Sequence, residues 1–552
     1  MVKIAKLVGG AGTGKTTELL RIMEKVAETG VDPLHIGFVS FTRAARAEAA
    51  ERAADLFGVP VSLLERDGWF RTLHSVCYRL LRVSSEQLIT SDAKSREWLE
   101  NALQARLDAR SSIDEIAEQA FVGKTDAANA LNLWSAARAR LERFEPTWAE
   151  ANRCDDRTPS YDRCVEIIER YEHHKRLDNK LDFTDLLLRF AGYRLSVEGA
   201  ERVEPEGEWD DLPRYWFFDE QQDASALLHA VCERLIENAV GAYLVGDPFQ
   251  SIYGWAGADH RFFLNFDAAQ QRTMPRSYRC PAIISRLGER ILRECSDYYD
   301  RGISPAEHDG TIERAFGLTL LGSFLRAEDD WLLLARTNQQ AARIVACVES
   351  HSMPWQPTKG AGGFLAPAKQ ELLDALDALR GGGELTPAHV KRLVQLTPTK
   401  HGDAELLKRG AKSRFAEEGL RDGDRGRLRD VVEREKLLED IGFTPRFFEL
   451  IWSGQVGCYK DFAKFWKAYE RYGPELVRKP MLRIGTVHSV KGAEAENVAV
   501  LTTVSQPVVR AQSSRRGFDE ERRVEYVAVT RARRRLVIVD EVNRKQRMRL
   551  EA

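Results

Sequence analysis

The feature that most constrains this chain is a glycine-rich loop close to its N-terminus. Residues Gly9, Gly14, Lys15 and Thr16 fit the pattern G-x4-G-K-[ST] completely. An apolar run, Lys3 to Leu7, comes directly before the loop, and a stretch with apolar residues at helical spacing follows it. A strand, a glycine loop and a helix in this order bind phosphate, because the loop N–H groups and the helix N-terminus point at one anion. The sequence therefore predicts an α/β fold at the start of the chain.

Further apolar runs predict two sheets rather than one. The predicted strands are 36–41, 215–218, 242–245, 331–334, 483–486 and 498–501. Strands that alternate with helical stretches are typical of parallel sheets, because a crossover between parallel strands usually contains a helix. The predicted fold class is therefore α/β with two parallel-sheet domains.

Two helical sections interrupt these sheets. Helical periodicity dominates residues 85–181, with helices predicted at 93–107 and 127–144. Three glycines, 381–383, open a second section that is highly charged, mostly helical and ends near Pro474. The predicted domains are a first sheet domain at 1–84 and 182–276 with its insertion at 85–181, and a second at 277–380 and 476–552 with a short insertion at 381–475.

Composition limits the classes of protein that fit. The 552 residues exceed what one hydrophobic core organises, and 43% hydrophobic with 30% charged residues indicates a folded globular chain. The net charge is −2, from 82 basic and 84 acidic residues, so any nucleic-acid contact must depend on local patches. The longest apolar runs fall short of the roughly 18 residues that a membrane span needs. Because the eight cysteines also lack the spacing of a metal ribbon, we expect a cytoplasmic protein with reduced thiols.

Two carboxylates follow the predicted strand 215–218. Asp219 suits the coordination shell of Mg²⁺, and Glu220 suits orienting and deprotonating the water that attacks a phosphate. Taken alone, such a pair is equally compatible with a solvated turn. Lys15 and Thr16 would contact phosphate oxygens and Mg²⁺ respectively. Together the four residues predict a nucleotide-hydrolysis site.

Several further segments carry a resemblance to a known family. They are residues 41–45, 72–75, 181–187, 219–223, 245–255, 277–279, 486–492 and 521–532. With the glycine loop they follow the family's order from residue 9 to residue 532. The chain resembles the UvrD/Rep/PcrA-type superfamily 1 DNA helicases over nearly its whole length.

The resemblance implies two RecA-like domains of the P-loop NTPase fold, with ATP and Mg²⁺ bound in the cleft between them. The implied catalytic residues are Lys15, Glu220, Gln250, Arg279 and Arg531. The implied nucleotide contacts are Gly9, Gly10, Ala11, Gly12, Thr13, Gly14, Lys15, Thr16, Thr17, Tyr278 and Glu494, and the implied metal ligands are Thr16 and Asp219. Surface ion pairing is the alternative for the two arginines, and core packing is the alternative for Tyr278.

The resemblance also implies a path for single-stranded DNA. The implied contacts are Phe41, Thr42, Arg43, His74, Tyr253, Trp255, His488 and Ser489. Stacking of bases on aromatic rings tolerates any sequence, as a protein that moves along a strand requires. Burial in the core is the alternative for Phe41 and Trp255. The arginines at 515, 516, 522, 523, 531 and 533–535 alternate with glutamates, which favours intramolecular ion pairs for most of them.

The chain departs from the family pattern at a few positions. The eight residues before Gly9 contain no glutamine to recognise the adenine edge. Ala256 follows Trp255 where the family has arginine, and Thr17 stands where an arginine often follows the Walker threonine. The cation of the segment after Phe41 is shifted by one position, and the second insertion is short for the family.

The activity that the resemblance implies is that of an ATP-dependent DNA helicase. Such a protein would translocate 3′-to-5′ on single-stranded DNA, act at single/double-strand junctions and couple hydrolysis to unwinding, with a loading or accessory protein as a further partner. One alternative is a single-stranded-DNA-dependent translocase that displaces proteins without unwinding. A non-enzymatic assembly subunit is another, and the intact residues Lys15, Glu220 and Arg531 argue against it. Repair, recombination and replication all remain open as pathways.

Overall fold

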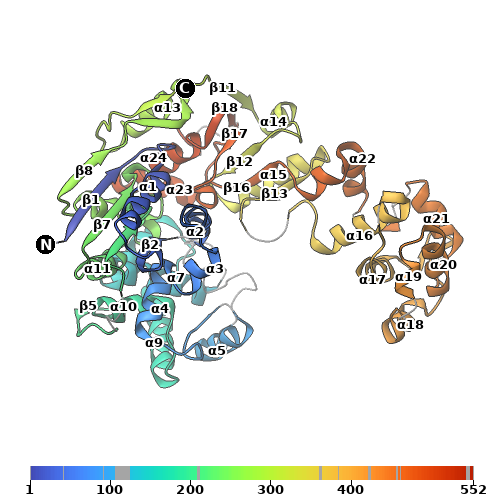
Figure 1. Cartoon of the computed structure of the whole chain (residues 1–552), viewed down its shortest axis with the longest axis horizontal. Coiled ribbons are helices and arrows are strands. Elements are labelled where there is room, and N and C mark those ends of the chain that lie inside the picture. The colour runs from blue at the N-terminus through green and yellow to red at the C-terminus, as the bar shows by residue number, and fades with distance from the viewer. Residues whose placement is uncertain are drawn as a thin grey trace.

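Two parallel sheets and two helical sections make up the chain, as seen in a computed structural model (Figure 1). The structure describes residues 2–41, 43–90, 92–105, 125–207, 212–359, 363–382, 384–420, 424–454, 458–459, 462–541 and 547–550. No helix among these residues is both long enough and apolar enough to cross a bilayer.

The first sheet has six parallel strands in the order β3-β2-β6-β7-β1-β8. Their bounds are β1 Lys3–Val8, β2 Ile36–Ser40, β3 Trp69–Thr72, β6 Tyr215–Phe218, β7 Gly241–Gly246 and β8 Gln270–Thr273. Helices α1 (Lys15–Glu28), α2 (Arg43–Phe57) and α3 (Val61–Arg66) pack on one face, and α4 (Leu73–Leu81), α10 (Phe183–Ala191) and α11 (Ala226–Ile236) on the other. All five residues of β2 are buried, as expected for a strand covered on both faces.

The second sheet also has six parallel strands, in the order β11-β18-β17-β12-β16-β13. Their bounds are β11 Thr311–Phe316, β12 Trp331–Ala335, β13 Trp355–Pro357, β16 Leu482–Thr486, β17 Ala495–Leu501 and β18 Ala532–Asp540. Helices α13 (Ala282–Leu292) and α24 (Arg515–Val529) cover one face, and α14 (Leu318–Phe324) and α15 (Asn338–Ser350) cover the other. The two sheets confirm the predicted fold class.

The two sheet bodies share part of their core. The apolar cluster beneath α13 and α24 also contains Ala11, Phe249 and Ile252 from the first body. The chain passes between the bodies within a few residues, since β8 ends at Thr273 and the next strand, β9, spans Arg276–Pro281. β9 pairs with the short strand β10 (Ser304–Ala306). The edges of the two bodies that face each other are therefore in direct contact.

The first helical section consists of α5 (Ala93–Leu103), α7 (Asp126–Arg140), α8 (Phe144–Cys154) and α9 (Tyr161–Leu177), which share one apolar core. The helix predicted at 127–144 is interrupted because Leu141 takes a left-handed φ of 54°. The helix predicted at 93–107 ends at Leu103. Residues 106–124 lie outside the described residues.

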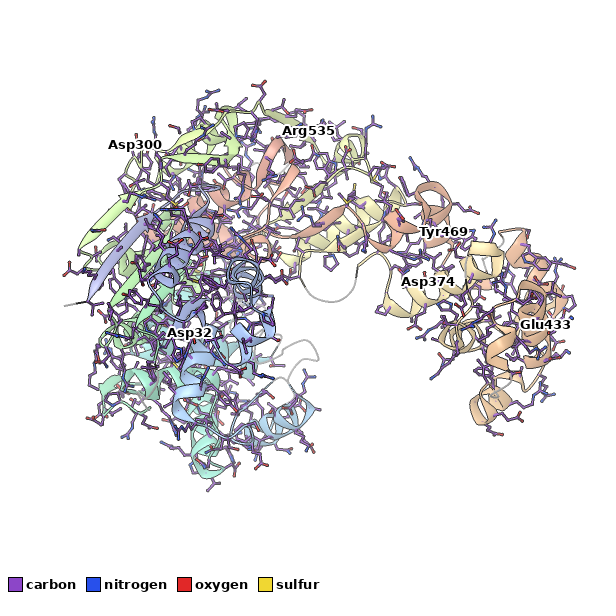
Figure 2. The ribbon with its side chains drawn as sticks, viewed as in Figure 1. Asp32, Asp300, Asp374, Glu433, Tyr469 and Arg535 are labelled. Atoms are coloured by element: carbon purple, nitrogen blue, oxygen red, sulfur yellow. The ribbon has the colours of Figure 1, made fainter. Side chains whose placement is uncertain are left out.

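The second helical section projects away from both sheets (Figure 1). Its helices are α16 (Pro367–Asp377), α17 (Pro387–Leu396), α18 (Ala411–Glu418), α19 (Asp424–Arg427), α20 (Val431–Ile441), α21 (Pro445–Trp452) and α22 (Ala463–Arg478). Figure 2 shows Asp374 and Tyr469 near its base and Glu433 in its outer part. Its core runs from Phe364 to Val477 and includes α16, so we place its start near residue 364 rather than at the predicted 381. The glycines at 381 and 382 belong to a π-helical turn, Ala378–Gly382, that directly continues α16.

Candidate nucleotide-binding site

The phosphate-binding loop, residues 9–17, joins β1 to α1. The N–H of Gly9 donates to the carbonyl of Gly246 at 3.0 Å, which ties the start of the loop to the end of β7. Gly12 and Gly14 have φ values of 68° and 78°, in the left-handed region that favours glycine. A Cβ atom on Gly12 would overlap the side chain of Arg279. The loop thus places its N–H groups at the N-terminus of the 14-residue helix α1, where an anion is stabilised.

Lys15, Thr16 and Asp219 meet beneath this loop. Lys15 Nζ donates to the carbonyl of Gly10 at 3.0 Å, and Thr16 Oγ1 donates to Asp219 Oδ2 at 2.7 Å. Burial lowers the pKa of Lys15, while Glu220 and two other carboxylates oppose that shift. Burial, and then the charge of Glu220, raise the pKa of Asp219 to about 6. The hydroxyl and the carboxylate are hard oxygen donors that fit Mg²⁺, which would neutralise phosphate charge there.

Glu220 directly follows Asp219 and adopts a left-handed φ of 57°. Non-glycine residues in this region concentrate at functional sites, where the surrounding structure holds them. Burial favours the neutral carboxyl, but the charges of Lys491 and Lys15 outweigh it and lower the pKa of Glu220. Gln222 Nε2 donates to Glu220 Oε2. Glu220 is therefore an ionised, oriented carboxylate that can accept a proton from a water molecule.

The opposite wall of the site comes from the second sheet body. Arg531, between α24 and β18, donates from Nη2 to Gln250 Oε1 at 3.0 Å. Its other donors reach the carbonyls of Val527 at 3.0 Å and Ala493 at 3.2 Å. Burial, and then the neighbouring Arg279, lower the pKa of Arg531 to about 10. Because Gln250 belongs to the first body, the contact joins the two walls.

Arg279 and Tyr278 lie on β9, directly against the phosphate-binding loop. Tyr278 N–H donates to the carbonyl of Gly12 at 2.8 Å, and its side chain is 68% exposed, which excludes core packing. Arg279 is ion-paired with Glu494 and donates from Nη1 to the carbonyl of Thr530 at 3.4 Å. Glu494, the predicted ribose contact, and Arg279, a predicted phosphate contact, therefore form an ion pair with each other. At the other end of the loop, the hydroxyl of Thr17 accepts from Arg52 at 2.7 Å.

Lys491 is a residue of this site that sequence reasoning did not select. It follows the turn η7 (His488–Val490), forms an ion pair with Asp223 and donates to the carbonyl of Gln250 at 2.8 Å. Its Nζ lies 3.8 Å from Glu220 Oε2. Burial raises the pKa of Asp223 to about 7 against the opposing charge of Lys491. Lys491 and Asp223 both lie in segments that carry the family resemblance. Their position in these segments is the one sequence signal that could have indicated a role in the site.

The predicted DNA contacts form two groups. Tyr253 lies between Trp255 and His488, with ring centroids 6.2 and 6.0 Å away, and its hydroxyl donates to the His488 carbonyl at 3.1 Å. Burial, and then Arg336, lower the pKa of His488 to about 3, so this ring is neutral. Ser489 Oγ shares a 2.7 Å hydrogen bond with Thr358 Oγ1. This group therefore bridges the two bodies.

The second group lies at the edge of the first sheet. Phe41 is partly buried against the core of that sheet, and His74 meets the edge of the Phe183 ring at 6.1 Å. Thr42 lies outside the described residues, as does the side chain of Arg43, the first residue of α2. Phe41 follows β2 and His74 follows β3, and these two strands pair with each other, so both residues lie at the same end of neighbouring strands. They belong to elements separate from the Tyr253 group.

The C-terminal arginines are ion-paired, as predicted. The pairs are Arg515–Asp519, Arg516–Glu520, Arg522–Glu525, Arg523–Asp297, Arg533–Glu494, Arg534–Glu496 and Arg535–Glu313. Most of these charges are therefore taken up by ion pairs within the second body and at its junctions. Arg531 differs from them because it donates to neutral oxygens instead of a carboxylate.

Comparisons with known proteins agree with this architecture. The family model of the UvrD/REP helicase N-terminal domain matches residues 3–271, and that of the UvrD-like helicase C-terminal domain matches residues 473–542. The chain belongs to the UvrD/PcrA-type superfamily 1 DNA helicases, which are ATP-dependent enzymes.

Individual relatives cover different parts of the family architecture. YjcD of Bacillus subtilis (strain 168) is 23% identical over 98% of this chain and 77% of its own length. The ATP-dependent DNA helicase PcrA of Staphylococcus aureus (strain Mu50) is 23% identical over 68% of this chain, and PcrA of Leuconostoc citreum is 26% identical over 67%. The matched part spans about half of the PcrA chains, 51% and 49%.

Proposed function

We propose that this chain hydrolyses ATP with Mg²⁺, translocates 3′-to-5′ along single-stranded DNA and couples hydrolysis to duplex unwinding. In this proposal Lys15, Glu220, Gln250, Arg279 and Arg531 act on the phosphates and the attacking water. Thr16 and Asp219 hold the metal, and residues 9–17 with Tyr278 and Glu494 hold the nucleotide. The two sheet bodies, residues 1–84 with 182–276 and residues 277 to about 363 with 476–552, would form the two walls of the site.

One observation carries the proposal: groups from both bodies meet at one place. Arg531 donates to Gln250, and the charges of Lys15, Lys491 and Arg531 all act on the same carboxylate, Glu220. Phosphoryl transfer is catalysed almost entirely by positioning and by positive charge around the transferred group. A site built from two bodies can only be complete when they close, so its chemistry can drive their relative movement.

DNA binding in this proposal uses both groups of predicted contacts. Tyr253 and Trp255 would stack on bases beside the junction of the bodies, and Phe41 would do so at the first sheet. His74, Thr42, Arg43, His488 and Ser489 would contact the strand nearby. Base stacking contributes about 1–3 kcal/mol per base and is independent of sequence. The partners are therefore single strands and single/double-strand junctions, with a loading protein as a further candidate.

ATP hydrolysis and strand separation should be measured side by side on 3′-tailed, 5′-tailed and blunt duplexes. We expect single strands to stimulate hydrolysis, 3′-tailed duplexes alone to be unwound, and Lys15→Ala to abolish both activities because it removes the cation at the β- and γ-phosphates. Unwinding restricted to 5′-tailed duplexes would contradict the direction. Hydrolysis without strand displacement at any enzyme excess would favour the protein-displacing translocase, and hydrolysis that survives Lys15→Ala would refute the site.

A further inference from the structure

Arg301 is a buried cation that has no role in the nucleotide-binding site as described so far. It lies between α13 and β10, and its side chain is only 1% exposed although the preceding Asp300 lies at the surface (Figure 2). Its guanidinium lies over two rings, 4.8 Å from the centroid of Phe249 and 5.4 Å from that of Tyr526. Removing an ion from water is costly unless close partners compensate. The position therefore requires specific partners.

Those partners come from both sheet bodies. Arg301 Nη1 donates to Asp247 Oδ1 at 2.6 Å, and Nη2 donates to Glu289 Oε1 at 2.7 Å and to the Tyr526 hydroxyl at 3.4 Å. The Asp247 side chain is fully buried. The Tyr526 hydroxyl also accepts from the N–H of Ala11 in the phosphate-binding loop, at 3.3 Å. Arg301 thus connects α13, α24 and the loop that follows β7.

Asp247 passes this contact on to the site. Its Oδ2 accepts from Gln250 Nε2 at 2.7 Å. Because Asp247 accepts this hydrogen bond, it holds the amide with its NH₂ group toward Asp247 and its oxygen toward Arg531. The Arg531 donor meets that oxygen at 3.0 Å. Arg301 and Arg531 therefore hold the two ends of one short loop, residues 247–250.

We propose that Arg301 is a positioning residue for ATP hydrolysis, which holds the Asp247 carboxylate in place and thereby orients the Gln250 amide toward Arg531. This inference rests on the proposed function of the site. Among the described residues Arg301 makes no hydrogen bond to the phosphate-binding loop or to Lys15, and it acts through Asp247 and Tyr526. Its role is to hold residues 247–250 of the first body in place against the second body. Arg531, at the other end of this loop, contacts the nucleotide.

Neutralising Arg301 should disturb catalysis more than nucleotide binding. In Arg301→Gln the buried Asp247 loses its charged partner, and a buried carboxylate without a cation is strongly destabilised in its position. The carboxylate and the loop that carries it then move toward other donors, so Asp247 no longer fixes which way the Gln250 amide points. Misplacement of this kind lowers kcat by about 10- to 100-fold. KM for ATP should stay within about 3-fold, since the hydrogen bonds of Lys15 and Tyr278 do not involve Arg301 or Asp247.

The test is a double-mutant cycle of Arg301→Gln, Asp247→Asn and the double variant, in the full chain. Steady-state kcat and KM with single-stranded DNA and the thermal midpoint Tm are measured for each. We expect the double variant to be no slower than Asp247→Asn alone, because the unpaired charge is then absent. Arg301→Lys should recover part of kcat, since it keeps the charge, and Arg286→Gln, an exposed position on α13, is the matched control.

The outcomes separate this inference from the proposed function. If the fold loss in kcat of the double variant equals the product of the fold losses in the two single variants, the inference is overturned. A rise in KM without a fall in kcat would also overturn it. If the wild-type chain hydrolyses no ATP, the proposed function fails, and the cycle in Tm still decides whether Arg301 supports Asp247. Additive shifts in Tm would then refute the pairing, whereas a double variant more stable than Arg301→Gln would support it.

Discussion

The substitution Arg531→Lys keeps a positive charge opposite Lys15 and removes the planar fork. The guanidinium donates to the carbonyls of Val527 and Ala493 at 3.0 and 3.2 Å and to the amide oxygen of Gln250 at 3.0 Å. An ammonium group projects its donors from a single point and cannot meet three acceptors placed around a fork. We expect the variant to fold and to bind ATP, but to lose the oriented charge that Arg531 provides.

The size of the loss follows from the chemistry and from these contacts. Removing an arginine finger lowers phosphoryl transfer by about 10³- to 10⁵-fold, and the retained charge puts lysine at the lower end. A 10³-fold fall in kcat corresponds to about 4 kcal/mol at 1.36 kcal/mol per factor of ten. Each buried carbonyl left without a donor costs about 1–3 kcal/mol of stability, so Tm should also fall.

The assay is steady-state ATP hydrolysis at saturating single-stranded DNA, together with binding of a fluorescent ATP analogue and a thermal melt. Arg535→Lys is the matched control, because Arg535 lies on β18, which begins directly after Arg531, and pairs with Glu313 instead of Gln250. We expect that control to stay within about 3-fold of wild type, as for other partly exposed ion pairs. An Arg531→Lys kcat within tenfold of wild type would refute the reasoning. An equal fall in both variants would trace the loss to β18 rather than to the site.

Two further substitutions address the nucleotide contact and a buried carboxyl. Tyr278→Ala should raise KM for ATP about 10-fold with kcat within about 3-fold, because stacking on its exposed ring contributes about 1–3 kcal/mol, and Tyr278→Phe should behave as wild type; an unchanged KM for Tyr278→Ala would exclude the stacking role. Burial raises the pKa of Glu525 to about 8, against the charge of Arg522. A carboxyl with a raised folded-state pKa binds its proton more tightly in the folded protein, so stability falls as pH rises from about 4.5 to 8. Calorimetry should therefore show Glu525→Gln gaining Tm relative to wild type between pH 5 and pH 8, and a constant difference would contradict the assignment.

Local patterns predicted the fold because they act over short distances. The strand before Gly9, the glycine loop and α1 are specified by neighbouring residues, and the structure bears them out. The break at Leu141 was missed because nothing in its side chain demands a left-handed backbone. The three glycines at 381–383 suggested a boundary, but packing of α16 with the helical section decides where that section begins.

The same distinction applies to the candidate site. Asp219 and Glu220 follow a strand, so their place at its carboxyl end could be predicted from position alone. Lys491 and Arg301 could not be selected in this way, because each gains its importance from a partner that is distant in the sequence: Asp223 for Lys491 and Asp247 for Arg301. Long-range pairing of buried charges leaves no periodic trace along the chain.

The passage of the chain between the two sheets has a mechanical consequence. On one side of the crossing, Met274 N–H donates to the carbonyl of Val8 at 2.8 Å, and on the other, Ser277 Oγ donates to the carbonyl of Ala11 at 2.8 Å. The connecting segment, residues 274–277, is thus hydrogen-bonded at both ends to the backbone that would bind the triphosphate. A rearrangement of that backbone would therefore be passed directly to the segment that connects the two sheets, without any intervening element.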